Sequence, residues 1–190
     1  GSIATLAVQD GVISGSVHRD GHEWVVIESA GGETSGLYTI REIDPNAPQP
    51  TESDEVVPQL SATDGEFSST QSATCQEDGS KISVLIVYTA EARDAAGGVA
   101  AIEALINRRI SEMNTANDVS RVNFDWVLAD TMQIDYTETG SIFADLENLQ
   151  GKTDGRMDDV HATRDAAKAD LVALLISEGS DGACGSAYRL

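Results

Sequence analysis

The sequence predicts an α/β protein in which a mostly parallel, twisted sheet with crossover helices follows a small β-rich unit. Two nearly continuous apolar runs, Ile82–Val87 and Leu171–Ile176, are typical of strands buried on both faces of a parallel sheet. Segments with helical periodicity lie between them, and the whole order is β-α-β-α-α-β. Parallel strands need long connections, which helices supply, so this order favours a parallel sheet.

Residues 1–43 predict a small antiparallel sheet. Short apolar runs there are separated by the turn pairs Asp10-Gly11, Asp20-Gly21 and Gly31-Gly32, which are typical of β-hairpins. We expect the strands at Leu6–Val8, Val12–Val17, Trp24–Ile27 and Leu37–Ile43.

Residues 44–80 differ in composition from both flanking units. All four prolines lie there among Ser, Thr, Gln and acidic residues, and no apolar periodicity remains. We interpret this stretch as an exposed, flexible linker between a unit at residues 1–43 and a unit at residues 81–190. Because an extended polar backbone is accessible to proteases, we expect limited proteolysis to cut here first.

Three helical segments and one further strand are predicted within residues 81–190. The first helix places Glu103, Asn107 and Glu112 on the face opposite its apolar stripe. That stripe consists of Val99, Ile102, Leu105, Ile106, Ile110 and Met113. Val122–Leu128 alternates apolar and polar residues, as a half-buried strand does. Shorter helical segments follow at residues 142–149 and 156–168.

The chain is strongly acidic, with 12 Lys and Arg residues against 32 Asp and Glu residues and a formal net charge of -20. Its field repels phosphate backbones and anionic lipids, so nucleic acid and membranes are poor partners. A solvated acidic surface is favoured over calcium binding. No apolar run is long enough to span a membrane, and the start has no signal-peptide pattern. Because the chain begins with Gly1 instead of Met, we interpret it as a piece of a longer protein.

Two cysteines are too few for a disulfide scaffold. A single bridge between Cys75 and Cys184 fits an exported protein, and the alternative is that Cys184 pairs with a cysteine beyond Leu190. Titration of free thiols distinguishes these arrangements, because two free thiols exclude the internal bridge.

The histidines do not form a recognisable metal motif. His18 and His22 are four residues apart, as two zinc ligands on one helix would be. However, Asp20-Gly21 between them predicts a hairpin turn, which places them on separate strands beside a surface loop. His161 stands alone in a predicted helix and is interpreted as an interior hydrogen-bonding residue rather than a ligand.

Glycine and aspartate motifs also have ordinary structural explanations. Gly151-Lys152-Thr153 imitates the end of a P-loop but lacks the first glycine of that motif, so a surface turn is favoured. Gly97-Gly98 is interpreted as a tight turn before a helix, with an anion site as the alternative. Capping of a helix start is favoured over a cation site for four carboxylates, Asp154, Asp158, Asp159 and Asp165. None of these motifs assembles a catalytic site.

A series of short segments from Ile82 to Leu190 carries a family resemblance. In order they are Val84–Thr89 with Ala92-Arg93, Gly97-Gly98 with Ala101-Ile102 and Leu105-Ile106, Asn114, Asn117, Tyr136–Gly140, Leu146, Leu149, Asp154–Asp158, Val160-His161, Arg164-Asp165, Ala169–Val172 and Cys184–Tyr188. This series resembles bacterial reprolysin-like zinc metallopeptidases of the metzincin group, and especially their peptidyl-Asp subgroup. One departure is Ala90, where the family usually has proline.

The resemblance implies a division of roles along the chain. Residues 1–43 are similar to a propeptide, and residues 81–190 to the N-terminal part of a metzincin catalytic domain. The family binds zinc through a HExxHxxGxxH helix, whose glutamate activates a water for peptide hydrolysis. That motif is absent from this sequence, so we expect it within a few tens of residues after Leu190. The chain alone is then expected to be inactive, without tightly bound zinc, and the parent to be secreted.

The resemblance also suggests where a peptide substrate would lie. In metzincins the substrate runs along an edge strand of the sheet by β-augmentation. That strand corresponds to Cys184–Leu190, so Gly185 and Ala187 are candidate contacts to the substrate backbone, and a plain edge strand is the alternative. Two other functions stay open, a non-catalytic α/β adhesion or binding module and a phosphate-ligand protein on a flavodoxin-like fold.

Overall fold

The computed structural model describes residues 1–20, 22–30, 36–44, 79–177 and 185–187. Most of the expected linker and both cysteines lie outside these residues. The linker, the first proteolytic cut and the Cys75–Cys184 bridge therefore stay predictions.

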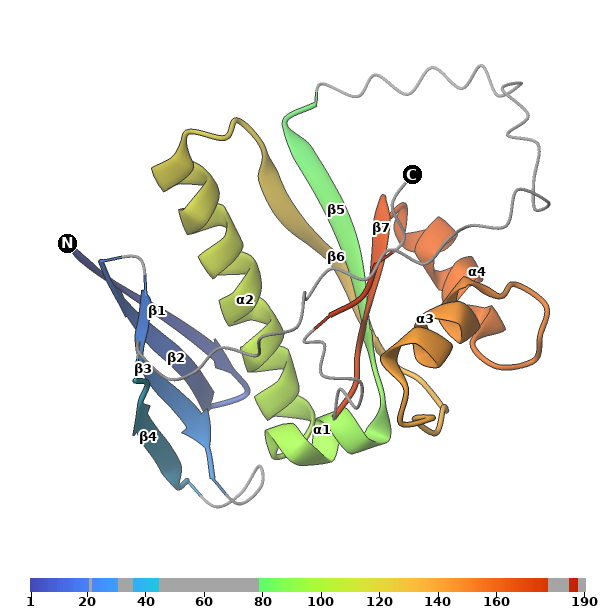
Figure 1. Cartoon of the computed structure of the whole chain (residues 1–190), viewed down its shortest axis with the longest axis horizontal. Helices are drawn as coiled ribbons and strands as arrows, with labels where there is room; N and C mark the ends of the chain where they lie inside the picture. The colour runs from blue at the N-terminus through green and yellow to red at the C-terminus, as the bar shows by residue number, and fades with distance from the viewer. Residues whose placement is uncertain (21, 31–35, 45–78, 178–184, 188–190) are drawn as a thin grey trace.

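Two sheets lie on opposite sides of one long helix, α2 (Val99–Ser120), as Figure 1 shows. The far face of the second sheet is covered by α3 (Ile142–Gln150) and α4 (Asp158–Ala167). No helix in the described part of the chain is long and apolar enough to cross a membrane. The predicted mixture of a parallel sheet, helices and a separate β-rich segment is thus observed.

The first sheet is antiparallel, and its four strands pair in chain order. They are β1 (Ser2–Gln9), β2 (Val12–Arg19), β3 (His22–Ser29) and β4 (Tyr38–Glu42). Asp10 and Gly11 have φ values of 48° and 83°, so both central residues of the first hairpin turn are left-handed. Two-residue hairpin turns of this kind match the twist of the strands, which explains the Asp-Gly signal.

The second sheet is wholly parallel and has the order β6-β5-β7. Its strands are β5 (Lys81–Tyr88), β6 (Asp125–Gln133) and β7 (Leu171–Leu175). The strand predicted at Val122–Leu128 begins later, at Asp125. Helix α2 ends at Ser120, and its C-cap residue, Arg121, has a left-handed conformation with φ 57°. The next residues connect the helix to the sheet edge before pairing starts.

Strand β5 is the centre of the core. On one face Val84 and Ile86 pack with Ile102 and Ile106 of α2. On the other face Leu85 and Val87 pack with residues of α3 and α4 and of the loop before α4, namely Leu149, Met157 and Val160. Burial on both faces is the physical reason for the continuous apolar run, and the prediction from that run is confirmed.

A short helix that was not predicted, α1 (Ala90–Ala96), links β5 to α2. The Thr89 side chain accepts a hydrogen bond from the Ala92 backbone N–H at 2.9 Å and so caps the start of α1. Gly97 and Gly98 follow with φ values of 100° and 119°, which side chains with a Cβ rarely adopt. The predicted tight turn at the glycine pair is confirmed, and it reverses the chain between the two helices.

Candidate functional site

An apolar groove of about 640 Å³ follows β7. Strand β7 pairs with β5 on one side, and no other described strand pairs with it. The groove is lined by residues of β7, by Leu146 and Leu149 of α3, by Met113 of α2 and by Gly185–Ala187. Its position along a strand edge makes it suited to an extended apolar segment.

Gly185 and Ala187, the predicted substrate contacts, are exposed and lie at this groove. Ser186 between them is half-buried, so the two candidates are the more accessible positions. The expected edge strand is not formed at residues 185–187, although its remaining residues lie outside the described ones. Contact with a substrate stays a prediction.

A polar network is centred on Asp145, which lines the groove. The Asp145 side chain is 1% exposed, and its Oδ1 accepts hydrogen bonds from the Tyr136 hydroxyl at 2.6 Å and from the Thr139 N–H and hydroxyl at 3.0 and 2.8 Å. Asn148 donates to the Tyr136 oxygen at 2.7 Å, and Arg156 donates to Asn148. Burial, and next the hydrogen bond to Asp145, raise the pKa of Tyr136.

Asp145 Oδ2 is buried and has no hydrogen-bond partner among the described residues. Sequence reasoning missed this network, although Tyr136 and Thr139 belong to the motif that carries the resemblance. One sequence signal was available for Asp145. It is an acidic residue beside apolar Leu146 in a predicted helical segment, which is a position where a buried carboxylate can occur.

Glu138 joins the carboxyl ends of β5 and β7. Its carboxylate accepts hydrogen bonds from the Thr89 hydroxyl at 2.5 Å and from the Ser177 N–H and hydroxyl at 2.7 and 2.8 Å. Ligands of parallel sheets bind beyond the carboxyl ends of the strands. Here the Glu138 side chain links the carboxyl ends of β5 and β7 and so fixes their relative position.

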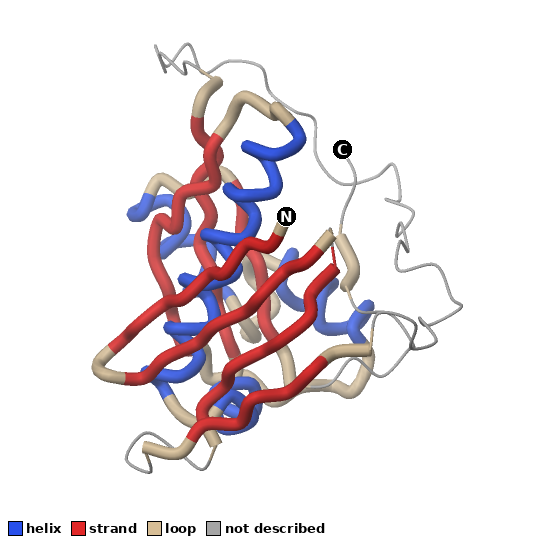
Figure 2. Tube along the Cα trace, turned by 90° about the vertical axis from the view of Figure 1, so that its left-hand side faces the viewer, coloured by secondary structure: helices blue, strands red, loops and turns tan. Residues whose placement is uncertain are grey.

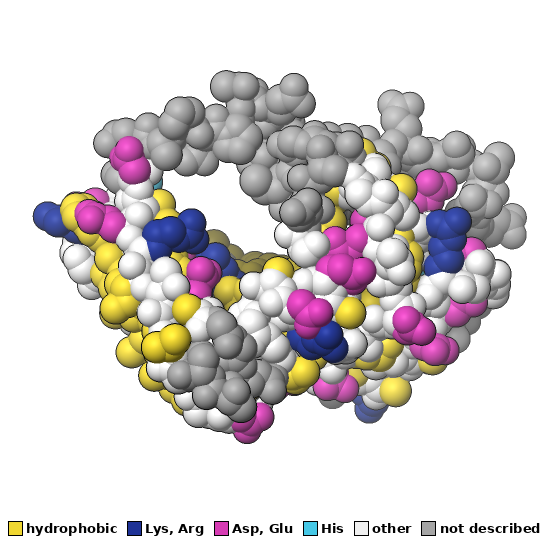
Figure 3. Space-filling model, turned by 90° about the horizontal axis from the view of Figure 1, so that it is seen from below, with side chains coloured by type: hydrophobic (Ala, Val, Ile, Leu, Met, Phe, Trp, Pro, Cys, Tyr) yellow, Lys and Arg dark blue, Asp and Glu magenta, His cyan; other side chains and the backbone are white. Residues whose placement is uncertain are grey.

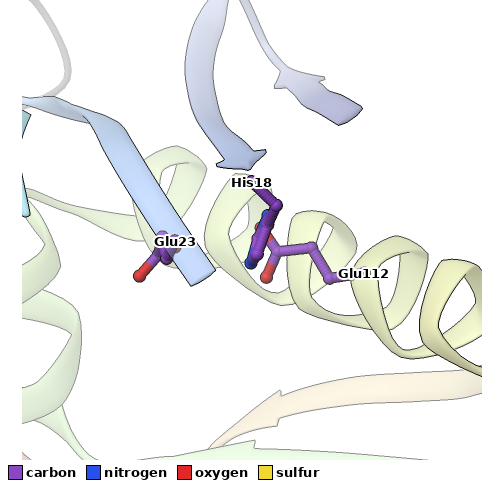
Figure 4. A group of neighbouring side chains, drawn as sticks. All are labelled: His18, Glu23 and Glu112. Carbon is purple, nitrogen blue, oxygen red and sulfur yellow. The ribbon is translucent and has the colours of Figure 1, made fainter. Parts of the chain in front are cut away.

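In the described part of the chain, one group of three side chains could together hold a metal ion. It consists of His18, Glu23 and Glu112. Figure 4 shows that His18 and Glu23 come from the adjoining ends of two strands and Glu112 from α2. As predicted, His18 and His22 lie on separate strands of one hairpin. Both carboxylates already pair with arginines, Glu23 with Arg108 at 3.2 Å and Glu112 with Arg109 at 2.9 Å. We therefore interpret the group as an ion-pair network.

The remaining motifs have structural roles, but the expected helix capping is not among them. His161 is half-buried, with Nε2 3.0 Å from the Gly151 carbonyl oxygen, which confirms an interior hydrogen bond. Lys152 and the residues after it form an exposed turn. Capping of α4 by an aspartate side chain is not observed, because the residue at the N-cap is Met157 and no side chain makes a cap hydrogen bond. Asp158 and Asp159 lie instead in the first turn of α4, and Asp158 accepts a hydrogen bond from the Gly155 N–H at 3.2 Å. Asp165 lies at the other end of α4 and pairs with Arg164, so capping of a helix start was wrong for it.

Acidic side chains are spread over the face of the molecule in Figure 3 rather than gathered in one patch. A dispersed charge of this kind keeps a surface solvated and offers no concentrated cation site on that face.

Comparison with known families identifies the second unit. The sequence profile of the reprolysin-like metallopeptidases, family M12B, matches residues 80–189. This chain belongs to the reprolysin-like metallopeptidases. The match starts just before β5 and includes the whole parallel sheet, the groove and the Gly185–Ala187 segment.

Individual relatives support this family assignment. The reprolysin-like chain is 33% identical over 99 residues to a peptidyl-Asp metalloendopeptidase of Stenotrophomonas maltophilia strain K279a. It is 31% identical over 99 residues to the enzyme of the same name in Xanthomonas campestris pv. campestris. The aligned part is 52% of this chain but 23% of each relative, so the chain covers less than a quarter of their length. No solved structure gives a significant match.

Membership of a metallopeptidase family raises the question of its zinc. Zinc sites in peptidases use three protein ligands that converge on the metal. The described residues of this reprolysin-like chain do not fit such a site, because the group at His18 has both its carboxylates paired with guanidinium groups. His161 belongs to α4, which covers the face of the parallel sheet opposite α2, and its ring hydrogen-bonds Gly151 instead.

Proposed function

We propose that this chain is part of a secreted, zinc-dependent metalloendopeptidase that hydrolyses peptide bonds in peptide or protein substrates. The match of residues 80–189 to the reprolysin-like family is the observation that carries the proposal. Residues 1–43 act as a propeptide segment, residues 44–80 as a linker, and residues 81–190 as the N-terminal part of the catalytic domain. The antiparallel sheet, separate in the chain from the matched region, supports this division.

The zinc ligands belong to parent residues outside this chain, on the expected HExxHxxGxxH helix. When bound there, zinc would polarise the scissile carbonyl group and lower the pKa of a water. This chain contributes the sheet and the groove along β7, where Gly185 and Ala187 contact the substrate backbone. Without the metal ligands, the chain alone is inactive.

The test is a peptidase assay of the parent protein with peptides that contain aspartate, because the relatives are named peptidyl-Asp metalloendopeptidases. We expect activity in the culture supernatant, its loss on treatment with a zinc chelator, and its recovery when zinc is restored. Replacement of the motif glutamate by alanine should abolish activity while zinc stays bound. Activity that persists after complete metal removal, or a parent without the motif, would show that a non-catalytic binding module is the better assignment.

A further inference from the structure

Helix α2 has two covered faces, one against each sheet. Figure 2 shows the four-stranded sheet facing the viewer with helices behind it, and β1 and β2 contact α2. Val12 of β2 packs with Ala100 and Ala101. Further along the same side, Arg108 and Glu112 contact the sheet. The polar face of α2, on which the sequence predicted Glu112, is thus an interface between this helix and the first sheet.

Arg108 is the centre of this interface. Its side chain is fully buried, at 0% exposure. Nη1 donates to the Gly15 carbonyl oxygen at 3.3 Å, and it lies 3.2 Å from Glu23 Oε1 and 3.4 Å from Glu112 Oε1. Gly15 and Glu23 belong to the first sheet, so an arginine of one unit takes two of its three acceptors from the other.

A second arginine and a serine complete the contact. Arg109 Nη1 lies 3.4 Å from Glu23 Oε1 and 2.9 Å from Glu112 Oε2. The Ser16 hydroxyl of β2 donates to Glu112. Two carboxylates thus meet two guanidinium groups, of which Arg108 is fully buried and Arg109 is half exposed. Removal of one partner of a buried ion pair destabilises the interface, because the other charge is left buried without compensation.

Small side chains of α2 bring the two units close together. Ala100, Ala101 and Ala104 are all buried, and Ala101, Ala104 and Arg108 recur at helical spacing on one side. The small side chains let the sheet approach the helix closely, and Glu23 reaches Arg108 at 3.2 Å. The β7 groove is lined by no residue of the first sheet, so this interface leaves it open.

We propose that this face of α2 is a specific binding surface for the N-terminal sheet, residues 2–42, and that the sheet stays bound there as a noncovalent partner when the chain between the two units is cut. The partner is recognised by apolar contact at Val12 and by the Glu23–Arg108 pair. This proposal goes beyond the peptidase assignment, because it depends only on contacts within the chain.

The experiment places a unique protease recognition sequence within residues 45–78 of the otherwise intact chain. After complete cutting, size-exclusion chromatography at 0.15 M salt (about physiological ionic strength) should show both pieces in one peak. Surface-immobilised second unit should rebind the released sheet. Separation of the wild-type pieces on cutting at micromolar concentration, with both still folded by circular dichroism, would overturn the proposal.

Variants test the charge pair. Arg108→Met and Glu23→Gln should each weaken rebinding roughly tenfold or more, mainly through faster dissociation. Glu23→Gln leaves the Arg108–Glu112 pair of α2 intact, so it remains informative if Arg108→Met fails to fold. Arg164→Met, which removes an arginine paired with Asp165 on α4, is the matched control and should bind as wild type does. If all three variants bind equally well, the Glu23–Arg108 pair does not contribute to recognition of the sheet.

A chelator distinguishes the ion pairs from a metal. We expect EDTA to leave the complex intact, because guanidinium groups already neutralise Glu23 and Glu112. Release of the sheet by EDTA, with restoration by added zinc, would show instead that a metal at His18, Glu23 and Glu112 holds the interface.

Discussion

Ser83 donates two hydrogen bonds to the carboxylate of Asp170, one from its backbone N–H and one from its hydroxyl, and both donors lie 2.7 Å from Oδ2. The Asp170 N–H donates in turn to the Ser83 carbonyl oxygen at 2.9 Å. This reciprocal contact joins β5 to the residue that precedes β7. The hydrogen bonds, first from the backbone and then from the side chain, lower the pKa of Asp170 below its ordinary value.

The lowered pKa of Asp170 predicts a loss of stability in acid. A carboxyl group whose pKa is lower in the folded chain stabilises the fold above its unfolded pKa, about 4 for Asp, and this contribution is lost as the pH falls through the folded pKa. In urea unfolding at pH 7, Asp170→Asn should be less stable than wild type by at most about 1 kcal/mol, since Asp170 is exposed. The difference should narrow below about pH 4. Asp118→Asn, at an exposed position of α2, is the matched control, and an identical pH profile for both variants would contradict the prediction.

The hydroxyl of Tyr136 should contribute measurably to stability. Tyr136→Phe removes the donor to buried Asp145 and the acceptor for Asn148, so both lose a partner. We expect the free energy of unfolding to fall by about 1–3 kcal/mol. Tyr38→Phe removes an exposed hydroxyl whose two hydrogen bonds are 3.3 Å long, and it should cost less than about 0.5 kcal/mol. If chemical denaturation shows equal losses of unfolding free energy for the two variants, the network around Asp145 contributes no more to stability than an exposed hydroxyl does.

The isolated chain should not retain zinc. A tight site needs three or four convergent ligands, and the described group at His18 has both carboxylates paired. Elemental analysis after dialysis against metal-free buffer should find well under one zinc per chain. One retained zinc per chain would contradict the assignment of the ligands to residues outside it.

Gly185 and Ala187 should affect catalysis in the parent enzyme. If their backbone groups pair with the substrate, Gly185→Pro and Ala187→Pro each remove or displace a donor, and kcat/KM should fall about tenfold or more. Ser186→Ala keeps every backbone donor and should leave kcat/KM within about twofold of wild type. Unchanged kcat/KM in both proline variants, with zinc still bound, would show that Gly185 and Ala187 do not contact the substrate backbone.

The local features of this protein could be predicted because each has a short-range physical cause. The continuous apolar run of β5 reflects burial on both faces, and the Asp10-Gly11 and Gly97-Gly98 pairs reflect backbone conformations with positive φ. Helix α1 escaped prediction because seven residues are too few to show a period, and its Thr89 cap is recognisable only once the helix is known.

The sequence by itself determined the strands, the main helices, the hairpins and the family resemblance, because these depend on neighbouring residues or on motif order. Only the tertiary structure decided which elements meet. Ser16 and Glu112 are 96 positions apart, and Arg108 and Glu23 are 85 apart, so no local pattern relates them. Arg108 belongs to a residue type that is usually solvated, yet it is buried here, and a sheet far away in the sequence supplies two acceptors to its Nη1. Its Nε and Nη2 have no hydrogen-bond partner among the described residues. The polar network around Asp145 has the same origin, since a loop and two turns of α3 must fold together before its hydrogen bonds exist.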